Sequence, residues 1–441
     1  MWSALLKISS IPALIVLQNK DFRLLWGARW VHEVSRRMEL LVLGYLIFSL
    51  TDSAFQVGLL AVFLNGPRPA LSLLAGLLAD RLDRRRILVG VHFAYLGIAA
   101  TLLVLLLSNA IQPWQVFIVI LLQGTVKVLD DPTRRTALFD LAGERHIAHA
   151  MSLETLTNNG GKILGPLAGG LLIAGFGFIG AYAVLVTLDL ASLFLMLPLK
   201  LPPQKLSSIR EIAILQDLKE GIGHSFSNKM VLGVLSISLV MNALVLPIQY
   251  FIPVIATNLL LVGPALGGLL GSTEGIGTFV GALVIGVRRS FTYHGRIFVG
   301  GALIVALGVT MVAWSPWFLV SCTLLFLAGI GQSGFSTMQS TILLLSSPPA
   351  MRGRIMGSQG LVNGLGHLLG GSEIGALASA FGISLAIGLN AGVGLLLILP
   401  VIVLTPLVWR PLETFSDNDQ SIDSIPAVVQ DRITDPADAE G

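Results

Sequence analysis

The residues best suited to chemistry lie close together in one apolar stretch near the N-terminus. Six charged or titratable side chains fall within eleven residues: Arg29, His32, Glu33, Arg36, Arg37 and Glu39. In a helix, Glu33 lies four residues from both Arg29 and Arg37, so these charges share one face and partly neutralise each other. Such a face either handles a substrate or a proton, or it is an ion-pair ladder that holds this helix against its neighbours.

Further charges interrupt the apolar stretches that follow. The bases inside apolar stretches are Arg29, Arg36, Arg37, Arg68, Lys127 and Lys162, and we expect them to contact an anionic substrate. An acid buried beside a base can change its protonation when its surroundings change, so we expect proton coupling at Glu33, Asp130 and Glu154. Two lone histidines, His32 and His367, are more typical of packing residues that form hydrogen bonds.

The composition indicates what surrounds these charges. The chain has 441 residues, 54% hydrophobic and only 12% charged, with a mean hydropathy of +0.82, whereas soluble domains carry about 25% charged residues. So much apolar surface requires lipid as the main solvent. The 48 glycines are typical of helices that pack closely in a membrane. The single cysteine, Cys322, cannot form an intrachain disulfide.

The hydrophobic pattern predicts an all-α polytopic membrane protein with twelve transmembrane helices, each near the ~20 residues that a bilayer requires. The predicted spans are 22–50, 54–79, 87–107, 114–128, 151–174, 178–199, 230–256, 264–287, 297–314, 317–344, 355–381 and 383–408. Arg36 then lies ~20 Å along the first helix from Phe22, close to the middle of the bilayer. Charges at that depth are costly unless they are paired or face water, so we expect them to line a central cavity.

The positions of Lys and Arg predict the topology. If the N-terminus is inside, the six bases named above fall within spans, and the other 22 of the 28 Lys and Arg lie in inside segments. Short loops rich in these residues stay in the cytoplasm. We therefore expect a multi-pass protein of the cytoplasmic (inner) membrane with both termini cytoplasmic.

The longest inside loop divides the chain into two halves of six helices. The predicted parts are a cytoplasmic lead-in (1–21), an N-terminal half (22–199), an inter-half loop (200–229), a C-terminal half (230–409) and an acidic disordered tail (410–441). Within the inter-half loop, residues 209–226 are amphipathic and are expected to lie along the membrane surface.

One loop sequence resembles a known family. The stretch from Gly76 to Arg86, Gly-Leu-Leu-Ala-Asp-Arg-Leu-Asp-Arg-Arg-Arg, resembles the loop between spans 2 and 3 of major facilitator superfamily transporters. The resemblance implies the major facilitator fold and a cytoplasmic gate in which Asp80 docks on the end of span 11 near Arg352. The implied gate residues are Gly76, Asp80, Arg81, Arg84, Arg85, Arg134, Arg135 and Arg352.

A second motif indicates the direction of transport. Span 5 contains Gly161, Gly165, Pro166, Gly169 and Gly170, which resemble the span 5 motif of the superfamily's antiporters. Small residues four apart let a neighbouring helix approach closely, and the proline bends the span. Asp83 stands where the superfamily usually has glycine, which resembles the branch of drug exporters that includes siderophore and macrolide efflux proteins. Span 1 departs from that branch, because it is far more charged.

Together these features predict a secondary transporter that exports a small amphiphilic or anionic compound in exchange for protons. The alternatives are uptake or facilitated exchange of an anionic metabolite, and a non-transporting membrane scaffold or receptor. No hydrolase, metal-binding or nucleotide-binding motif occurs, so we expect no enzyme activity, no cofactor and no metal. The expected partners are a small-molecule substrate, protons and the lipid bilayer, without nucleic acid, and the protein is expected to be a monomer.

Overall fold

The computed structural model describes residues 15–69, 71, 78, 82–202, 223, 228–287, 292–348 and 351–409. Nearly all of them are helical. The α-helices are α2 (Lys20–Thr51), α3 (Ala54–Asn65), α5 (Arg84–Leu107), α6 (Pro113–Ala142), α7 (Ile147–Met196), α9 (Lys229–Val240), α10 (Ile252–Val254), α11 (Pro264–Val287), α12 (His294–Trp314), α13 (Phe318–Leu345), α14 (Arg352–Phe381) and α15 (Ile383–Leu404). Short 3-10 turns cover Val16–Gln18, Glu144–His146 and Leu246–Tyr250, and π-helical turns cover Met241–Val245 and Ile255–Leu259.

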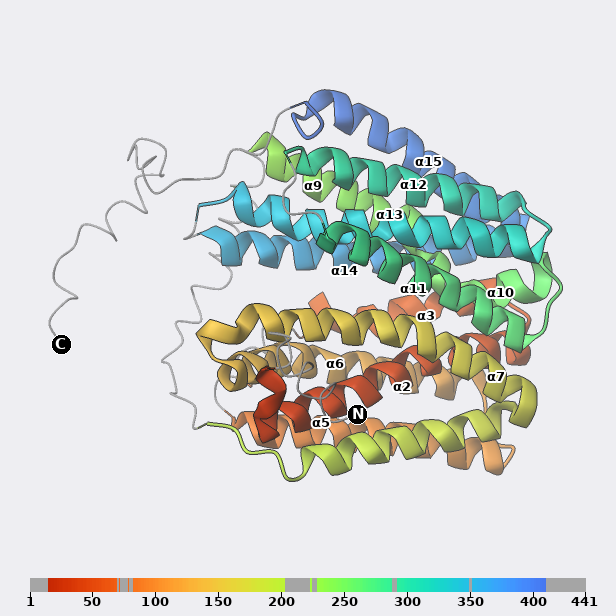
Figure 1. Ribbon diagram of the computed structural model, residues 1–441. Helices are drawn as coiled ribbons and strands as arrows, with labels where there is room; N and C mark the ends of the chain where they lie inside the picture. The colour runs from red at the N-terminus through yellow and green to blue at the C-terminus, as the bar shows by residue number, and fades with distance from the viewer. Residues whose placement is uncertain are drawn as a thin grey trace, which may run out of the picture.

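The helices form two bundles. In Figure 1 the bundle of α2 to α7 lies below and the bundle of α9 to α15 lies above. Successive helices run in opposite directions. We call the end of the molecule where α2 begins the Lys20 end, and the end where it finishes the Asp52 end. The described chain enters α2 and leaves α15 at the Lys20 end, at the left of Figure 1.

In the described ranges, helical segments correspond to each of the twelve predicted spans; for the second span (54–79) these ranges cover 54–69, 71 and 78. Seven of those in the described ranges are long and apolar enough to cross a membrane: α5, α7, α9 with its following turns, α11, α12, α13 and α15. The 50 residues of α7 cross twice, because Gly177 breaks the helix with a φ of +67° that favours glycine. The remaining spans are α3 and the long but more polar α2, α6 and α14. The predicted all-α fold with two six-helix halves is confirmed.

Two span boundaries differ from the prediction. Span 4 was expected to end at Val128, but α6 continues through Pro132 to Ala142. The hydroxyl of Thr133 donates to the Leu129 carbonyl at 2.8 Å, and that of Thr136 donates to the Pro132 carbonyl, so polar side chains support the helix around its proline. Span 7 is interrupted after Val240 by π-helical and 3-10 turns, where two prolines at 247 and 253 remove backbone donors.

Close backbone approach joins the two halves toward the Asp52 end. A Cβ placed on Gly170 of α7 would lie only 2.7 Å from the Cα of Gly268 in α11. Within the described part of the chain, two side-chain hydrogen bonds also cross between the halves. Ser272 donates to the Ile163 carbonyl at 2.7 Å, and Asn65 donates to the Tyr250 hydroxyl at 3.2 Å. Small residues therefore bring the halves into contact, as expected where lipid supplies no hydrophobic drive for helix association.

Several predicted segments lie wholly or mostly outside the described residues. These are most of the lead-in, most of the inter-half loop with its amphipathic stretch 209–226, and the acidic tail. The predicted boundaries of these parts stay predictions.

The glycine contact between α2 and α7 gives a test of the packing. A Cβ on Gly165 would lie 2.8 Å from the backbone nitrogen of Met38, so Gly165→Leu forces the two helices apart. We expect it to lower the free energy of unfolding by about 1–3 kcal/mol, measured by denaturant titration of tryptophan fluorescence in detergent. Gly175→Leu is the control, because nothing lies within 4 Å of that position. Equal stability of the two variants would contradict this packing.

Candidate functional site

The centre of the candidate site is a carboxylate held by three arginines of its own helix. Glu33 is fully buried, and its oxygens lie 2.7 Å from Arg29, 2.5 Å from Arg36 and 2.9 Å from Arg37. The helical spacing of three and four residues places all three guanidinium groups around it. One negative charge therefore holds three positive charges in place within the membrane-spanning part of α2.

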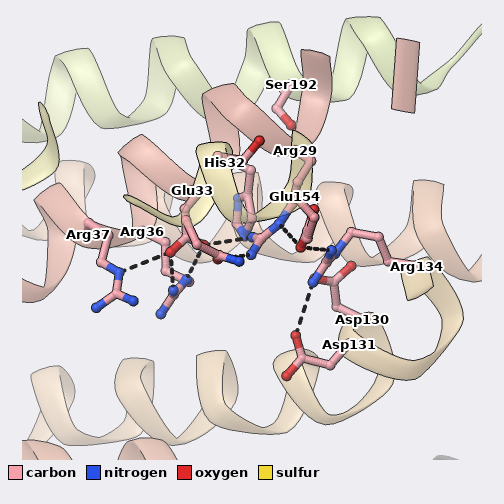
Figure 2. Close-up of polar contacts among 12 residues, drawn as sticks. Arg29, His32, Glu33, Arg36, Arg37, Asp130, Asp131, Arg134, Glu154 and Ser192 are labelled. Carbon is pink, nitrogen blue, oxygen red and sulfur yellow. Dashed lines mark hydrogen bonds and ion pairs between the residues drawn. The ribbon is translucent and has the colours of Figure 1, made fainter. Parts of the chain in front are cut away.

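The ion pairs continue from α2 to α6 and α7, as the dashed lines of Figure 2 show. Arg29 reaches Glu154 of α7 at 3.3 Å and donates to the Asn158 side-chain oxygen at 3.1 Å. The same oxygen of Glu154 also lies 2.6 Å from Arg134 of α6. Glu154 thus joins two arginines from different helices, and the network holds α2, α6 and α7 together.

Two aspartates of α6 extend this network toward α3. Arg134 lies 3.5 Å from Asp130 and 3.3 Å from Asp131. The other oxygen of Asp131 lies 2.9 Å from Arg68, which follows α3. Positive and negative side chains alternate along the whole row, so that most of its charge is compensated.

The accessible part of the network is mainly positive. The side chain of Arg68 is 44% exposed, and those of Arg36 and Arg37 are 23% and 20% exposed, whereas Glu33 is fully buried. Among the acids of the row, Asp131 is the most exposed, at 25%. Glu33, Asp130 and Glu154 therefore lie behind the guanidinium groups, and the accessible side chains of the row are three arginines and one aspartate, Asp131.

The two predicted lysines lie beside this surface. Lys127 of α6 is within electrostatic range of Arg36, Arg37, Arg68 and Asp131. On α14 in the opposite half, His367 is within electrostatic range of Lys127, Lys162, Arg37 and Arg68. The structure therefore brings all six predicted anion-contacting bases into one region, which is faced by a histidine from the C-terminal half.

A small cavity of about 50 Å³ lies where the two halves meet. Its polar lining consists of Arg37 and Lys162 from the N-terminal half with Gln249 and Glu274 from the C-terminal half. A cavity of this size has room for a few water molecules. Charges of opposite sign from the two halves thus meet at a cavity close to the arginine cluster.

The glycines of the span 5 motif position the cluster. Gly161 lies directly against Glu33, because an added Cβ would lie 2.6 Å from its Cγ. Gly165 and Gly169 continue the same contact along Met38, while Gly170 faces α11 of the other half. One stripe of small residues therefore seats the charged helix α2, and its last member contacts the C-terminal half.

The predicted gate is only partly described. Gly76, Asp80 and Arg81 lie outside the described residues, so the docking of Asp80 near Arg352 stays a prediction. The described gate residues bond within their own halves. Arg84 pairs with Asp140, Arg85 donates to the Leu197 carbonyl at 2.7 Å, and Arg352 donates to the Leu344 carbonyl at 3.0 Å. Arg135 is exposed.

Some polar residues of this region were not among the predicted site residues. His92 and Tyr95 of α5 lie beside His32, with ring centroids 5.5 and 4.4 Å away. Both are polar residues in the largely apolar helix α5, and their spacing of three places them on one face of the helix. That spacing could have indicated a polar face on this helix, but nothing in the sequence shows which helix the face contacts.

Three comparisons place the chain among known proteins. A family model described as transmembrane secretion effector matches residues 11–430. The enterobactin exporter EntS of Escherichia coli O1:K1 / APEC is 26% identical over 90% of this chain and 96% of its own. A Bacillus subtilis (strain 168) protein, the uncharacterized MFS-type transporter YfiS, is 28% identical over 81% of this chain and 85% of its own. The crystal structure of the nucleoside transporter NupG matches with a TM-score of 0.71 at 16% identity, over 87% of this chain and 98% of that one.

The central carboxylate gives a second test. Glu33→Gln removes the one charge that compensates three guanidinium groups, so we expect it to lower the free energy of unfolding by about 3–5 kcal/mol, as when one partner of a buried ion pair is removed. The control is Glu373→Gln, since Glu373 is an exposed carboxylate of α14. Denaturant titration in detergent measures both. An unchanged stability of Glu33→Gln would show that the cluster is not held by this carboxylate.

Proposed function

Because the chain belongs to the transmembrane secretion effector family of the major facilitator superfamily, we propose that it exports a small anionic compound in exchange for protons. The observation that carries the proposal is the cationic surface of Arg36, Arg37 and Arg68, inside the membrane and partly accessible. A cation in the middle of a helix that faces lipid costs about 2.5–3.5 kcal/mol, so a group of them marks a path for charged substrate. The enterobactin exporters among the relatives support the direction.

The chemistry of the surface favours anions over cations or neutral compounds. Guanidinium groups donate in a planar fork that matches carboxylate and phosphate oxygens, and two lysines add point charges beside them. His367 and Glu274 face this surface from the C-terminal half. An anion bound there would contact both halves, which is the arrangement that a rocking of one half against the other needs.

We further propose that the Lys20 end is cytoplasmic and that the structure represents the state open toward it. Among the described residues, close glycine contacts between the halves, such as Gly170 with Gly268, lie toward the Asp52 end. At the Lys20 end, Arg84 and Arg352 bond within their own halves. Closing the gate would then require Asp80 to dock on α14, as the family resemblance implies. The protein would act as a monomer, because each chain contains both halves.

The three predicted proton-coupling acids differ in how strongly they are held. Glu33 is bound by three arginines and Glu154 by two. Asp130 lies 3.5 Å from a single arginine, and its Oδ1 is buried with no hydrogen-bond partner among the described residues. Asp130 thus has the fewest cationic partners of the three acids and a buried oxygen that is open to a proton, so we propose Asp130 as the acid that exchanges protons.

Transport in inside-out membrane vesicles tests the anion surface. The panel contains enterobactin, citrate, a nucleoside and a neutral sugar, with a pH gradient imposed. We expect accumulation of an anion only, and a reduction of roughly tenfold or more in Arg68→Gln and Lys127→Gln, since each removes one cation worth at least ~1.4 kcal/mol to the bound anion. Arg23→Gln, an exposed base at the start of α2, should transport as the wild type does.

The same assay separates the alternatives. Accumulation of the anion in right-side-out vesicles instead would replace export by uptake or exchange. Movement of none of these compounds would favour the scaffold or receptor. Retention of full transport in both Arg68→Gln and Lys127→Gln would contradict the proposed surface.

The proposed topology has a separate test. A fluorescent protein fused after residue 409 should fluoresce, and alkaline phosphatase at the same place should be inactive, because the positive-inside rule keeps this end in the cytoplasm. Active phosphatase there would invert the topology. A phosphatase fusion at Asp52, which lies at the opposite end of α2, is the matched control and should be active.

A further inference from the structure

A second group of titratable side chains lies inside the N-terminal half, beside the arginine cluster. His32 and Glu39 of α2, His92 of α5 and Asp189 of α7 are all buried, with exposed fractions of 3 to 7%. These residues lie where one side of α2 packs against α5 and against the second part of α7. The proposed anion surface does not include any of them.

An acid and a histidine meet at the centre of this group. The Nδ1 atom of His32 lies 3.6 Å from the Oδ1 atom of Asp189, just beyond a normal hydrogen bond. Tyr95 and His92 pack on the His32 ring, with centroids 4.4 and 5.5 Å away. The histidine is thus held in position by rings, while its nitrogens stay available.

The polar atoms here are unsatisfied within the described part of the chain. Both ring nitrogens of His32, the Nε2 of His92 and the Oδ1 of Asp189 are buried without a hydrogen-bond partner. Buried polar groups are nearly always paired, and an unpaired one costs roughly 1–3 kcal/mol. A proton shared between His32 and Asp189 would satisfy an atom of each residue, because it turns a 3.6 Å approach into a charge-assisted hydrogen bond.

The surroundings of His32 contain groups of both signs. The titratable and charged groups near His32 or near its ring and acid neighbours are Arg29, Glu33 and Arg36 on α2, His92 and Tyr95 on α5, Asp130 and Asp131 on α6, and Asp189 and Tyr182 on α7. The arginines on α2 are already engaged by Glu33, whereas Asp189 has no arginine or lysine within ion-pair distance among the described residues. Among the described residues, His32 is therefore the only ion-pair partner of this acid.

We propose that His32 and Asp189 form a proton-binding site, and that the row from Asp130 through this pair to Glu39 carries the coupling proton through the N-terminal half. The inference rests on the proposed function and deepens it. Intramembrane chains of Asp, Glu and His side chains are typical of proton relays. From His32 to Glu39 the row extends ~10 Å along α2.

The ends of the row fit this role. Asp130 is within electrostatic range of His92 and Tyr95 and lies toward the Lys20 end of the row. Glu39 lies beside Gln123 and Tyr182 and is within electrostatic range of Asp189. A proton that enters at Glu39 passes to Asp189 and His32 and leaves at Asp130, and each transfer breaks one O–H or N–H bond and forms another. No electrons or co-reactant are needed.

The pair and the anion surface share one helix, which gives the coupling a physical basis. His32 is the direct neighbour of Glu33 on α2. Protonation of the pair tightens the contact between α2 and α7, and α2 also carries Arg36 and Arg37. A proton bound on one side of α2 therefore changes the position of cations on the other, without direct contact between proton and substrate.

The first test needs no substrate. Full-length protein with ¹⁵N-labelled histidine is titrated in lipid nanodiscs by NMR, and the His32 signal is assigned from its loss in His32→Gln. We expect His32 to titrate and its midpoint to change by about one pH unit or more in Asp189→Asn, since an opposite charge at this distance is lost. Asp52→Asn, an exposed acid at the end of the same helix, should leave the midpoint unchanged. A midpoint unaffected by Asp189→Asn would overturn the inference.

The second test separates coupling from transport. In proteoliposomes, Asp189→Asn and Glu39→Gln should still exchange labelled for unlabelled enterobactin at the wild-type rate. The rate of transport driven by a pH gradient should fall roughly a hundredfold in both variants, which is the low end of what a positioned proton-transfer group contributes. Equal loss of both activities would indicate a structural role, and gradient-driven transport at the wild-type rate would also overturn the inference. If the wild type itself moves no anion, the proposed function fails, while the titration still decides whether the pair binds a proton.

Discussion

The organisation of this protein depends on one buried carboxylate that holds three arginines inside a membrane. Without Glu33, the guanidinium groups of Arg29, Arg36 and Arg37 would repel one another in a medium that cannot screen them. With it, one cation bonds to Glu154 and two remain partly accessible. The arrangement keeps a positive surface at a depth where an isolated charge is unfavourable.

Close packing supports this charge cluster from behind. Gly161, Gly165 and Gly169 let α7 lie directly on the α2 backbone at the level of Glu33 and Met38. The same stripe ends at Gly170, which meets the C-terminal half. The site and the interface between the halves are therefore built on one helix, so that a shift of α7 changes both.

Much of the fold and part of the site could be predicted from the sequence. The apolar lengths and the positions of Lys and Arg gave twelve spans in two halves, because a bilayer imposes both constraints locally. The spacing of Arg29, Glu33 and Arg37 indicated their pairing for the same reason. The contact of His32 with Asp189, and that of Arg134 with Glu154, join residues far apart in the chain. No local sequence pattern predicts the helix packing that brings these residues together.

Span boundaries show the same limit. Span 4 was expected to end at Val128, yet α6 continues through Pro132 to Ala142, since Thr133 and the ion pairs of Arg134 support it. The break at Gly177, by contrast, falls between the predicted spans 151–174 and 178–199, so it was predicted from the sequence. Only the extension of α6 depended on side-chain contacts that the sequence did not show.

The most direct test of the account records internal pH and anion content together in proteoliposomes that contain the purified protein. The account predicts that enterobactin, or another anion of the panel, and protons move in opposite directions, and that an imposed proton gradient drives the anion against its own gradient. Movement of anion and proton in the same direction, or anion movement that is indifferent to the proton gradient, would contradict proton-coupled export.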